Sequence, residues 1–133
     1  MGKLNLTVSG RDLPRKDWFS KSDPFLCVLL ATRGQYQLVT KTETVMNNHN
    51  PDWETIEITD PDIHEHNKGL KIQLQVLDYD GPGKADDMCN AFFSIATLEE
   101  AAKTNQKLIL YNRKHKEDGY LIIKYFHLSS DLY

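Results

Sequence analysis

The chain has few residues that could cross-link it and no stretch long enough to span a membrane. Two cysteines, Cys27 and Cys89, are too few for a disulfide framework in 133 residues. We expect both to be reduced and buried, as small apolar residues of a cytoplasmic protein. No apolar run approaches the roughly 20 residues that a membrane-spanning helix needs. We see no signal peptide at the start, and Leu6 stands where a myristoylation pattern has Ser or Thr. Any membrane contact is therefore expected to be peripheral.

Net positive charge is also lacking. The formal net charge is −3, which excludes a polycation that binds nucleic acid. Hydrophobic residues make up 40% and charged residues 26%, as is ordinary for a globular chain. The length predicts one domain over residues 1–133 with a substantial core. The negative charge is concentrated in two short segments, since without five of their aspartates the formal charge would be +2.

Apolar residues recur at every second position, which is typical of strands with one buried and one exposed face. Leu4, Leu6 and Val8 show this alternation, whereas Phe25–Leu30 is apolar on both faces and is expected centrally in a sheet. We predict eight strands, at roughly residues 3–10, 24–31, 34–39, 40–46, 54–59, 70–78, 90–96 with 107–112 as its return partner, and 119–128. Short strands separated by turn residues indicate an all-β, antiparallel β-sandwich.

One segment favours a helix. Thr97 and Glu100 have the spacing of a capping box, and the alanines that follow at 101 and 102 are strong helix formers. The segment is short, and we expect a helix that crosses from one sheet to the other.

Five aspartates stand just outside strand-like runs, at spacings that suit a calcium site between two loops. Asp17 and Asp23 are six residues apart, and Asp80 and Asp86 follow Asp78 by two and eight residues. Calcium takes about six to eight oxygen ligands, many of them carboxylates. Like charges gathered in one pocket repel unless something offsets the repulsion. One Asp-x-Asp pair is ordinary turn chemistry, so the prediction depends on the full set.

Three segments, in order along the chain, resemble the C2 domain family. Residues 17–25 (DWFSKSDPF) resemble the first calcium-binding loop of C2 domains, and Asp78-Tyr79-Asp80 followed by Asp86 resembles the third. Asn50-Pro51-Asp52-Trp53 resembles the N-P-x-W turn that these domains place before a central strand. The resemblance implies an eight-stranded antiparallel sandwich with its binding loops at one end. It also favours the permuted type II topology, in which the last strand supplies the neighbour of the first.

Within that family the chain looks most like the second C2 domain of copines, through residues 41–53 and 97–101. Copines carry two C2 domains and a following von Willebrand A-like domain. Because the chain ends before such a domain could begin, we expect either a fragment of a larger copine-like protein or a stand-alone C2 protein.

The resemblance implies a peripheral module that binds anionic phospholipid membranes when calcium is bound. Asp17, Asp23, Asp78, Asp80 and Asp86 would supply the side-chain ligands. Main-chain oxygens of Lys16 and Tyr79 would complete the coordination of two or more ions. Two calcium ions would nearly cancel a local charge of about −5, whose members repel by about 1 kcal/mol per pair even in water.

Four residues are candidates for membrane contact. Trp18 and Phe19 lie in the middle of the first loop, where a bilayer interface would cover them; the alternative is that they pack over the base of the loop. Lys21 and Lys84 would each gain about 1 kcal/mol near an anionic leaflet. We expect a cytoplasmic monomer whose acidic loops are repelled by anionic lipid until calcium rises and the domain moves to the membrane.

Two other classes of function stay open. An enzyme would need convergent groups, but His64, Glu65 and His66 stand in a polar segment, and no phosphate-binding glycine loop or nucleophile elbow is present. We therefore expect no catalysis. The stronger rival is a calcium-independent C2-fold module that binds a protein partner, because a fold does not fix function. Trp53 is interpreted as a packed anchor, and Asp87 as a solvated neighbour of Asp86. Residues 113–116 are interpreted as a solvated basic loop.

Overall fold

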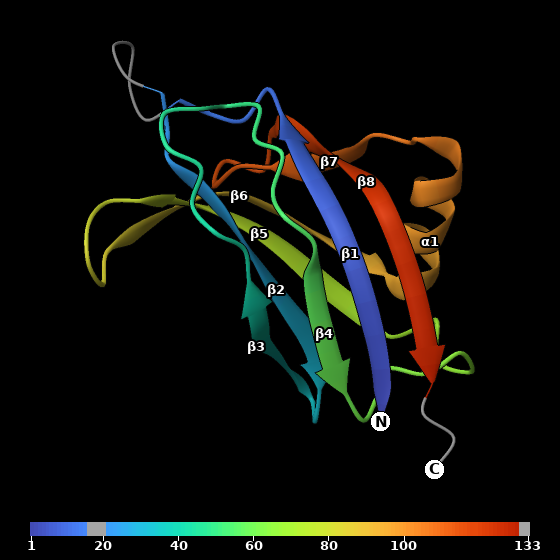
Figure 1. Cartoon of the computed structure of the whole chain (residues 1–133). Coiled ribbons are helices and arrows are strands. Elements are labelled where there is room, and N and C mark those ends of the chain that lie inside the picture. Colours follow the sequence, from blue (N-terminus) through green and yellow to red (C-terminus); the bar gives the residue numbers. More distant parts are fainter. Residues whose placement is uncertain (16–20, 131–133) are drawn as a thin grey trace.

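The computed structural model describes residues 1–15 and 21–130, in which the chain forms eight β-strands and one α-helix (Figure 1). The strands are β1 Gly2–Arg11, β2 Pro24–Thr32, β3 Gln35–Lys41, β4 Ile56–Asp60, β5 Lys71–Tyr79, β6 Ala85–Ser94, β7 Leu108–Tyr111 and β8 Glu117–Ser130. The helix, α1, spans Ile95–Thr104 and lies between β6 and β7 in the chain. No helix in the described residues is long and apolar enough to cross a membrane.

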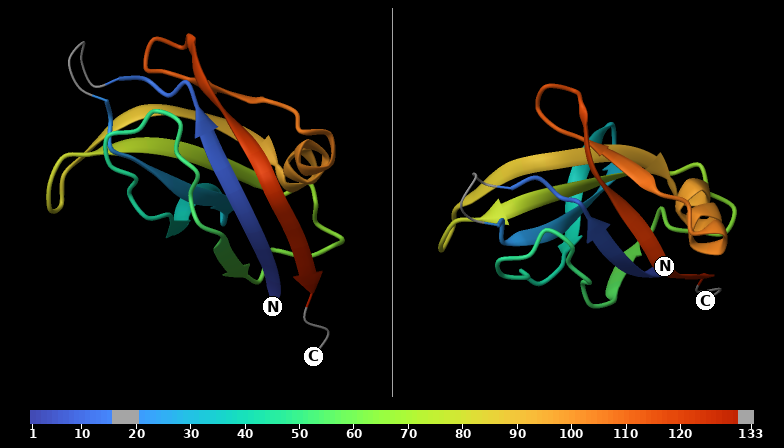
Figure 2. Two further views of the ribbon diagram at one scale, coloured as in Figure 1. Left: turned by 45° about the horizontal axis from the view of Figure 1, so that its top comes forward. Right: turned by 90° about the horizontal axis from the view of Figure 1, so that it is seen from above.

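Every strand pairing is antiparallel, and the strands follow the order β3-β2-β5-β6-β7-β8-β1-β4. The first four and the last four form two facing layers (Figures 1 and 2). One residue pair, Asn90 with Tyr111, joins β6 to β7 and so links the layers along one side. The last strand, β8, pairs with the first along almost its whole length, from Gly2 opposite Ser130 to Arg11 opposite Tyr120. The predicted eight-stranded sandwich with the permuted strand order is therefore confirmed.

The short crossover helix is also confirmed, but it begins earlier than the sequence suggested. Ser94, not Thr97, is the N-cap residue: its backbone is extended and its side-chain oxygen accepts a hydrogen bond from the backbone N–H of Thr97. Ile95, Leu98 and Ala101 form the buried face of α1. The helix ends at Thr104, and the C-cap residue Asn105 adopts the left-handed conformation that often terminates helices.

Two of the predicted strand boundaries were wrong. Residues 34–46 contain one strand, β3, and not two. The strand ends before Thr42, where a side-chain hydroxyl takes the place of the backbone carbonyl in pairing with β2. The Thr42 hydroxyl accepts a hydrogen bond from the N–H of Leu26 while the Thr42 N–H donates to the Leu26 carbonyl. Strand β6 begins at Ala85 instead of residue 90, since a register shift between Val76 and Leu77 lets its pairing with β5 continue.

The core between the layers is formed by the inward-facing apolar residues of the alternating pattern. Leu4, Leu6 and Val8 are almost completely buried, and Trp53 is 2% exposed, which confirms its role as a packed anchor. The Trp53 indole N–H donates to the Pro24 carbonyl at 3.2 Å. Because the inward faces of the strands supply mostly aliphatic side chains, the sandwich holds its loops on a dry, rigid base.

Both cysteines are free and buried, as predicted. Burial raises the pKa of the Cys27 thiol, although nearby Lys41 lowers it in part. Burial, with the carboxylates of Asp118 and Asp87 adding to it, raises the pKa of Cys89 to about 12. Both thiols therefore stay protonated and unreactive near neutral pH.

Two glycines with nearly the same φ angle provide a test of packing where β1 meets β8. Gly119 and Gly34 have φ of 85° and 82°, so Ala is strained at either position. A Cβ at Gly119 would lie 3.0 Å from the Asp12 carbonyl oxygen, whereas one at Gly34 would meet nothing within 4 Å. We expect Gly34→Ala to cost about 1 kcal/mol of unfolding free energy, and Gly119→Ala to cost about 1–3 kcal/mol more through crowding. Urea unfolding measures the free energy of unfolding of both variants. Equal losses would contradict the close approach of Gly119 to the Asp12 carbonyl.

Candidate functional site

Three of the predicted aspartates occupy neighbouring backbone positions where β2 begins, β5 ends and β6 begins. Pro24 lies opposite Asp78 in the β2–β5 pairing, so that Asp23 stands immediately beside this pair. Asp78 in turn lies opposite Asp86 in the β5–β6 pairing. Residues directly opposite in an antiparallel pair point to the same face of the sheet. Two carboxylates at such positions repel each other, and a divalent cation would offset that repulsion.

Asp78 is the buried member of this group, with 3% of its surface exposed. Its Oδ1 accepts a hydrogen bond from the backbone N–H of Asp23 at 2.8 Å. The backbone N–H of Tyr79 donates to the Asp23 carbonyl at 2.9 Å. These two bonds fix the end of the first loop on the end of β5, which determines where the Asp23 side chain starts.

The loop between β5 and β6 is a tight turn held by its own backbone. The N–H of Asp80 donates to the carbonyl of Lys84, and the N–H of Lys84 donates to that of Gly81, both at 3.0 Å. Gly81 and Gly83 adopt φ of 103° and 72°, conformations that a side chain would disfavour. Asp80 and Asp86 are exposed on either side of this turn, as is Lys84.

A third loop, residues 42–55, completes the site and was missed by sequence reasoning. The backbone N–H of Asn47, at φ 53°, donates to Asp23 Oδ1 at 2.6 Å, and the N–H of Asn48 donates to the Ser22 carbonyl. Asn tolerates this left-handed conformation better than most residues. The run of asparagines at positions 47, 48 and 50 carries the sequence signal for such a turn.

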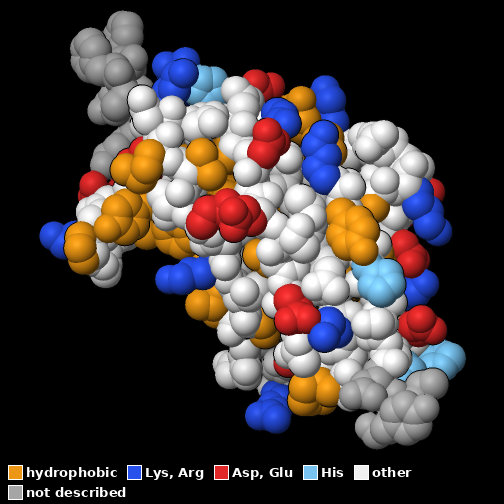
Figure 3. Space-filling view, in the orientation of Figure 1, with side chains coloured by type: hydrophobic (Ala, Val, Ile, Leu, Met, Phe, Trp, Pro, Cys, Tyr) orange, Lys and Arg blue, Asp and Glu red, His pale blue; other side chains and the backbone are white. Residues whose placement is uncertain are grey.

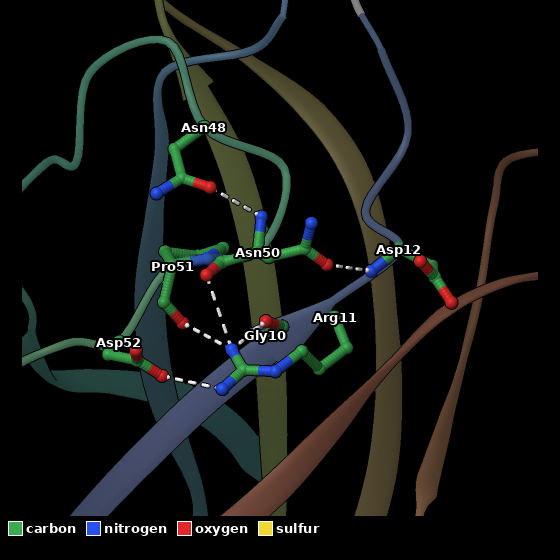
Figure 4. A network of polar contacts seen from close by, with 7 residues as sticks. All are labelled: Gly10, Arg11, Asp12, Asn48, Asn50, Pro51 and Asp52. Carbon is green, nitrogen blue, oxygen red and sulfur yellow. Dashed lines mark hydrogen bonds and ion pairs between the residues drawn. The ribbon is translucent and has the colours of Figure 1, made fainter.

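The third loop is anchored on β1 by a network around Arg11 (Figure 4). Arg11 Nη2 pairs with Asp52 Oδ1 at 2.8 Å, while Nη1 donates to the carbonyls of Gly10, Asn50 and Pro51 at 2.7, 3.2 and 3.3 Å. The side chain of Asn50 accepts from the N–H of Asp12, and its own N–H donates to Asn48 Oδ1. Hydrogen bonds from the Ser9 and Arg11 side chains hold the pKa of Asp52 below its usual value. One guanidinium thus fixes the base of the loop that reaches Asp23.

The remaining predicted residues divide into two groups. Asp17, the Lys16 main-chain oxygen, Trp18 and Phe19 lie outside the described residues. Lys21 is exposed near the start of β2. Among residues 1–15 and 21–130, no three His, Cys, Asp or Glu side chains converge as a metal cluster. The described donors nevertheless suit calcium, because they are all hard carboxylate oxygens and include the facing pair of Asp78 and Asp86.

Asp87 is half-buried and so less solvated than the sequence suggested. Its Oδ1 is buried and has no hydrogen-bond partner among the described residues. Its side chain lines a depression of about 790 Å³ between the start of β6, Arg15 and the turn from β7 to β8. Strand alternation explains the difference, because Asp87 points to the face opposite that of Asp86.

Comparison with known proteins identifies the architecture. The family model described as C2 domain matches residues 2–110. A solved structure described as BON1-C2B has 23% identity over 97% of this chain and 92% of its own, with a TM-score of 0.81. A C2 domain of plant Extended Synaptotagmin 1 has 20% identity over 92% of this chain and 89% of its own, with a TM-score of 0.62. A calcium-bound structure of two C2 domains of Extended-Synaptotagmin 2 has 21% identity, covering 92% of this chain and 45% of its own, with a TM-score of 0.56.

The lowered pKa of Asp52 predicts how stability depends on pH. A carboxyl whose pKa is depressed by folding stabilises the protein above its unfolded pKa of about 3.9, and this is lost as pH falls through the folded value. We expect Asp52→Asn to lower the unfolding free energy at neutral pH by less than about 1 kcal/mol, because the carboxylate is largely exposed. In acid the difference from the parent protein should disappear. Denaturant unfolding at neutral and at acid pH measures this difference in unfolding free energy. A difference that grows in acid would contradict the lowered pKa of Asp52.

Proposed function

Because the chain belongs to the C2 domain family, with the family model matching residues 2–110, we propose that it binds anionic phospholipid membranes in a calcium-dependent manner. It would act as a peripheral membrane-targeting module. The observation that carries this proposal is the facing pair of Asp78 and Asp86, with Asp23 beside it. Folding places these like charges at adjacent strand ends, an arrangement that is unfavourable without a cation.

The chain would hold calcium with residues from two loops. Asp23, Asp78, Asp80 and Asp86 would supply carboxylate oxygens, with Asp17 and the main-chain oxygens of Lys16 and Tyr79. When bound, two or more calcium ions would supply positive charge that bridges to lipid phosphate or carboxylate oxygens. The protein's own part is positional: the Asp23–Asp78 hydrogen bond and the turn at residues 80–84 keep the donors at one end of the sandwich.

The same end would face the membrane. Lys21 and Lys84 are exposed there and would be attracted to an anionic leaflet. Trp18 and Phe19 would enter the headgroup region. We propose a cytoplasmic, monomeric, non-catalytic signalling module that moves to the membrane when calcium rises. Within the family we place it nearest to the second C2 domain of copines, on residues 41–53 and 97–101.

A second candidate is a calcium-independent module that binds a protein. The observation in its favour is a group of exposed apolar side chains on β3 and β6. Leu38 and Phe92 are 58% and 54% exposed, and Tyr36 packs edge-on against Phe92 with ring centroids 5.1 Å apart. Exposed apolar patches commonly mark interaction surfaces, although this one lies away from the aspartates.

The two candidates differ in their response to calcium. A ligand that binds only the folded state raises the melting temperature by mass action. We expect millimolar calcium to raise the melting temperature clearly. The Asp23→Asn variant should need about tenfold more calcium to reach the same shift and the same vesicle pelleting. Asn keeps the acceptor for the Asn47 N–H but removes the charge. Asp62→Asn, an exposed residue of the β4–β5 connection, is the control of equal charge. An unchanged melting temperature would favour the protein-binding module.

Trp18 separates membrane insertion from ion binding. We expect Trp18→Ala to weaken calcium-dependent binding to phosphatidylserine vesicles by roughly tenfold, since a buried aromatic side chain contributes at least about 1.5 kcal/mol. Calcium affinity measured by calorimetry without lipid should stay the same. If calcium affinity fell as much as vesicle binding, Trp18 would instead be part of the structure of the first loop.

A further inference from the structure

An apolar groove of about 800 Å³ lies between β6 and β7, where the two layers of the sandwich meet. Asn90 opposite Tyr111 is the only residue pair that joins these strands in the described part of the chain, so the strands separate on either side of it. Alternate residues of a strand direct their backbone N–H and carbonyl groups away from its paired neighbour. Beyond Asn90, such groups of β6 therefore face the groove, and this sheet edge is open to a further strand.

The groove is lined mainly by apolar side chains from both strands. Ala91 of β6 and Leu108 of β7 are buried and lie deepest in it. Phe93 and Ile109 are half-buried beside them, and Tyr111 is exposed at the junction of the two strands. A ligand with apolar side chains would remove these partly exposed surfaces from water, which is favourable.

Both ends of the groove are basic. Lys107 precedes β7 at one end, and its ammonium lies 4.6 Å from the centre of the Tyr120 ring. Arg113 follows β7 at the other end and forms no side-chain hydrogen bond or ion pair in the described part of the chain. Asp87 is the one acidic residue among those that line the groove. Lys and Arg side chains gather along the top of the face drawn in Figure 3, the end where Figure 1 draws the turn that carries Arg113.

The turn that carries Arg113 is held in place by Asn112. Its Oδ1 accepts hydrogen bonds from the N–H groups of Lys114 and Lys116 at 2.9 and 3.2 Å, and its backbone N–H donates to the Lys116 carbonyl. The turn stands out from the two layers in Figure 2. The side chains of this basic segment, expected to be solvated, are exposed, and its backbone is fixed by internal hydrogen bonds. The guanidinium of Arg113 is therefore presented from an ordered backbone.

We propose that this groove binds an extended peptide segment of a partner protein, with apolar side chains at alternate positions and acidic residues near its ends. The peptide would add as a strand to the free edge of β6 beyond Asn90, so that its backbone groups pair with those of β6. Its apolar side chains would enter the gap between Phe93 and Ile109. Its acidic side chains would meet Lys107 and Arg113, which gives the two surfaces complementary charge.

The dimensions and the open backbone favour a strand over other occupants. The lining follows β6 from Asp87 to Phe93, a length of about 20 Å at roughly 3.4 Å per residue. An extended peptide of about six residues would span it. A helix uses its own backbone groups internally and an acyl chain has none, so neither would pair with the free edge of β6.

This site goes beyond the proposed function and can fail separately from it. None of the proposed calcium ligands lines the groove, so binding of the peptide needs no calcium. The groove is also distinct from the exposed apolar group on β3 and β6, with which it shares Phe92 but neither Tyr36 nor Leu38.

The first experiment selects a random heptapeptide library, displayed on phage, against the domain in a calcium chelator. We expect enriched sequences to carry apolar residues at alternate positions, with Asp or Glu near the ends. Fluorescein-labelled synthetic copies should bind with an affinity that falls as the salt concentration rises. No enrichment, or enriched sequences that are basic or lack the alternation, would overturn the proposal.

Charge variants test the two ends of the groove. Lys107→Glu with Arg113→Glu should weaken binding of these peptides by more than about tenfold. Lys103→Glu with Lys114→Glu is the matched control, because it makes the same charge change at exposed residues nearby that do not line the groove. Equal losses in the two variants would mean that only net charge matters, and the assignment would be wrong. Thermal unfolding of each variant confirms that it is folded.

Two apolar variants locate the peptide on the surface. Ile109→Ala, within the groove, should weaken peptide binding by about tenfold. Leu38→Ala, on β3 outside the groove, should leave it unchanged. A loss in Leu38→Ala as large as that in Ile109→Ala would place the peptide on the exposed group of β3 and β6 and contradict the proposal.

N-methylated peptides test whether a strand is added. In an extended peptide, alternate N–H groups point to one side, so methylating one alternate set should abolish binding while methylating the other set is tolerated. Hydrogen exchange of the amides within residues 91–93 should slow when the parent peptide binds. Unchanged binding of both methylated peptides would show that no backbone pairing forms, and would refute the added strand.

Vesicles provide the remaining comparison. Phosphatidylserine vesicles in chelator should not displace the peptide. Displacement that is lost in Lys107→Glu with Arg113→Glu would mean that the groove accepts a membrane surface instead, and the peptide assignment would fall. Calcium-dependent pelleting of the same variants reports on the proposed function independently.

Discussion

The buried carboxylate of Asp78 is the contact on which the organisation of the loop end depends. It accepts the backbone N–H of Asp23, and the following residue, Tyr79, donates to the Asp23 carbonyl. A carboxylate that is 3% exposed is costly unless it is hydrogen-bonded or paired with a cation. The first loop, the end of β5 and, through Asn47, the third loop are therefore joined at one point. Other features of the site, including the position of Asp86, are consequences of strand register around that point.

Charges of both signs are brought to the same end by this topology. Strands β7 and β8 form a hairpin whose turn lies beside the acidic start of β6. Arg113 and Lys114 on that turn are separated in the chain from Asp86 and Asp87 by an entire helix and strand. The formal net charge of −3 thus hides a dipolar surface at one tip of the molecule. Such a surface can respond to cations and anions separately.

Much of the fold could be predicted from the sequence because local patterns determine it. The alternation at Leu4, Leu6 and Val8 predicts a half-buried strand, and that is what β1 is. The predictions for the end of β3 and the start of α1 were wrong because a side chain there forms a hydrogen bond with a backbone group. Thr42 caps Leu26 and ends β3, while Ser94 displaces Thr97 as the N-cap residue. The Thr42 contact depends on a partner 16 residues away, which the alternating pattern does not reveal. The Ser94 contact is local, but Ser94 lies at the end of a strand-like run and was assigned to the strand.

The acidic residues of the candidate site could be singled out from the sequence, but the contacts that support them could not. Spacing alone singled out Asp23, Asp78 and Asp86, and the strand register brings them together. The contact from Asn47 and the anchoring of its loop by Arg11 use backbone N–H and carbonyl groups. These groups are the same in almost every residue, so the residue types do not reveal them. Asp87 was misjudged for a related reason, since its environment depends on a turn that lies about 25 residues further along the chain.

The two layers meet on one side through a single residue pair, Asn90 with Tyr111. Within each layer the strands share longer ladders, and on the other side β3 and β4 are not paired, so this pair is the one backbone link between the layers in the described strands. The acidic start of β6 and the basic turn after β7 lie on either side of this junction. A ligand that contacted both elements would therefore connect the two layers where the backbone joins them through one pair alone.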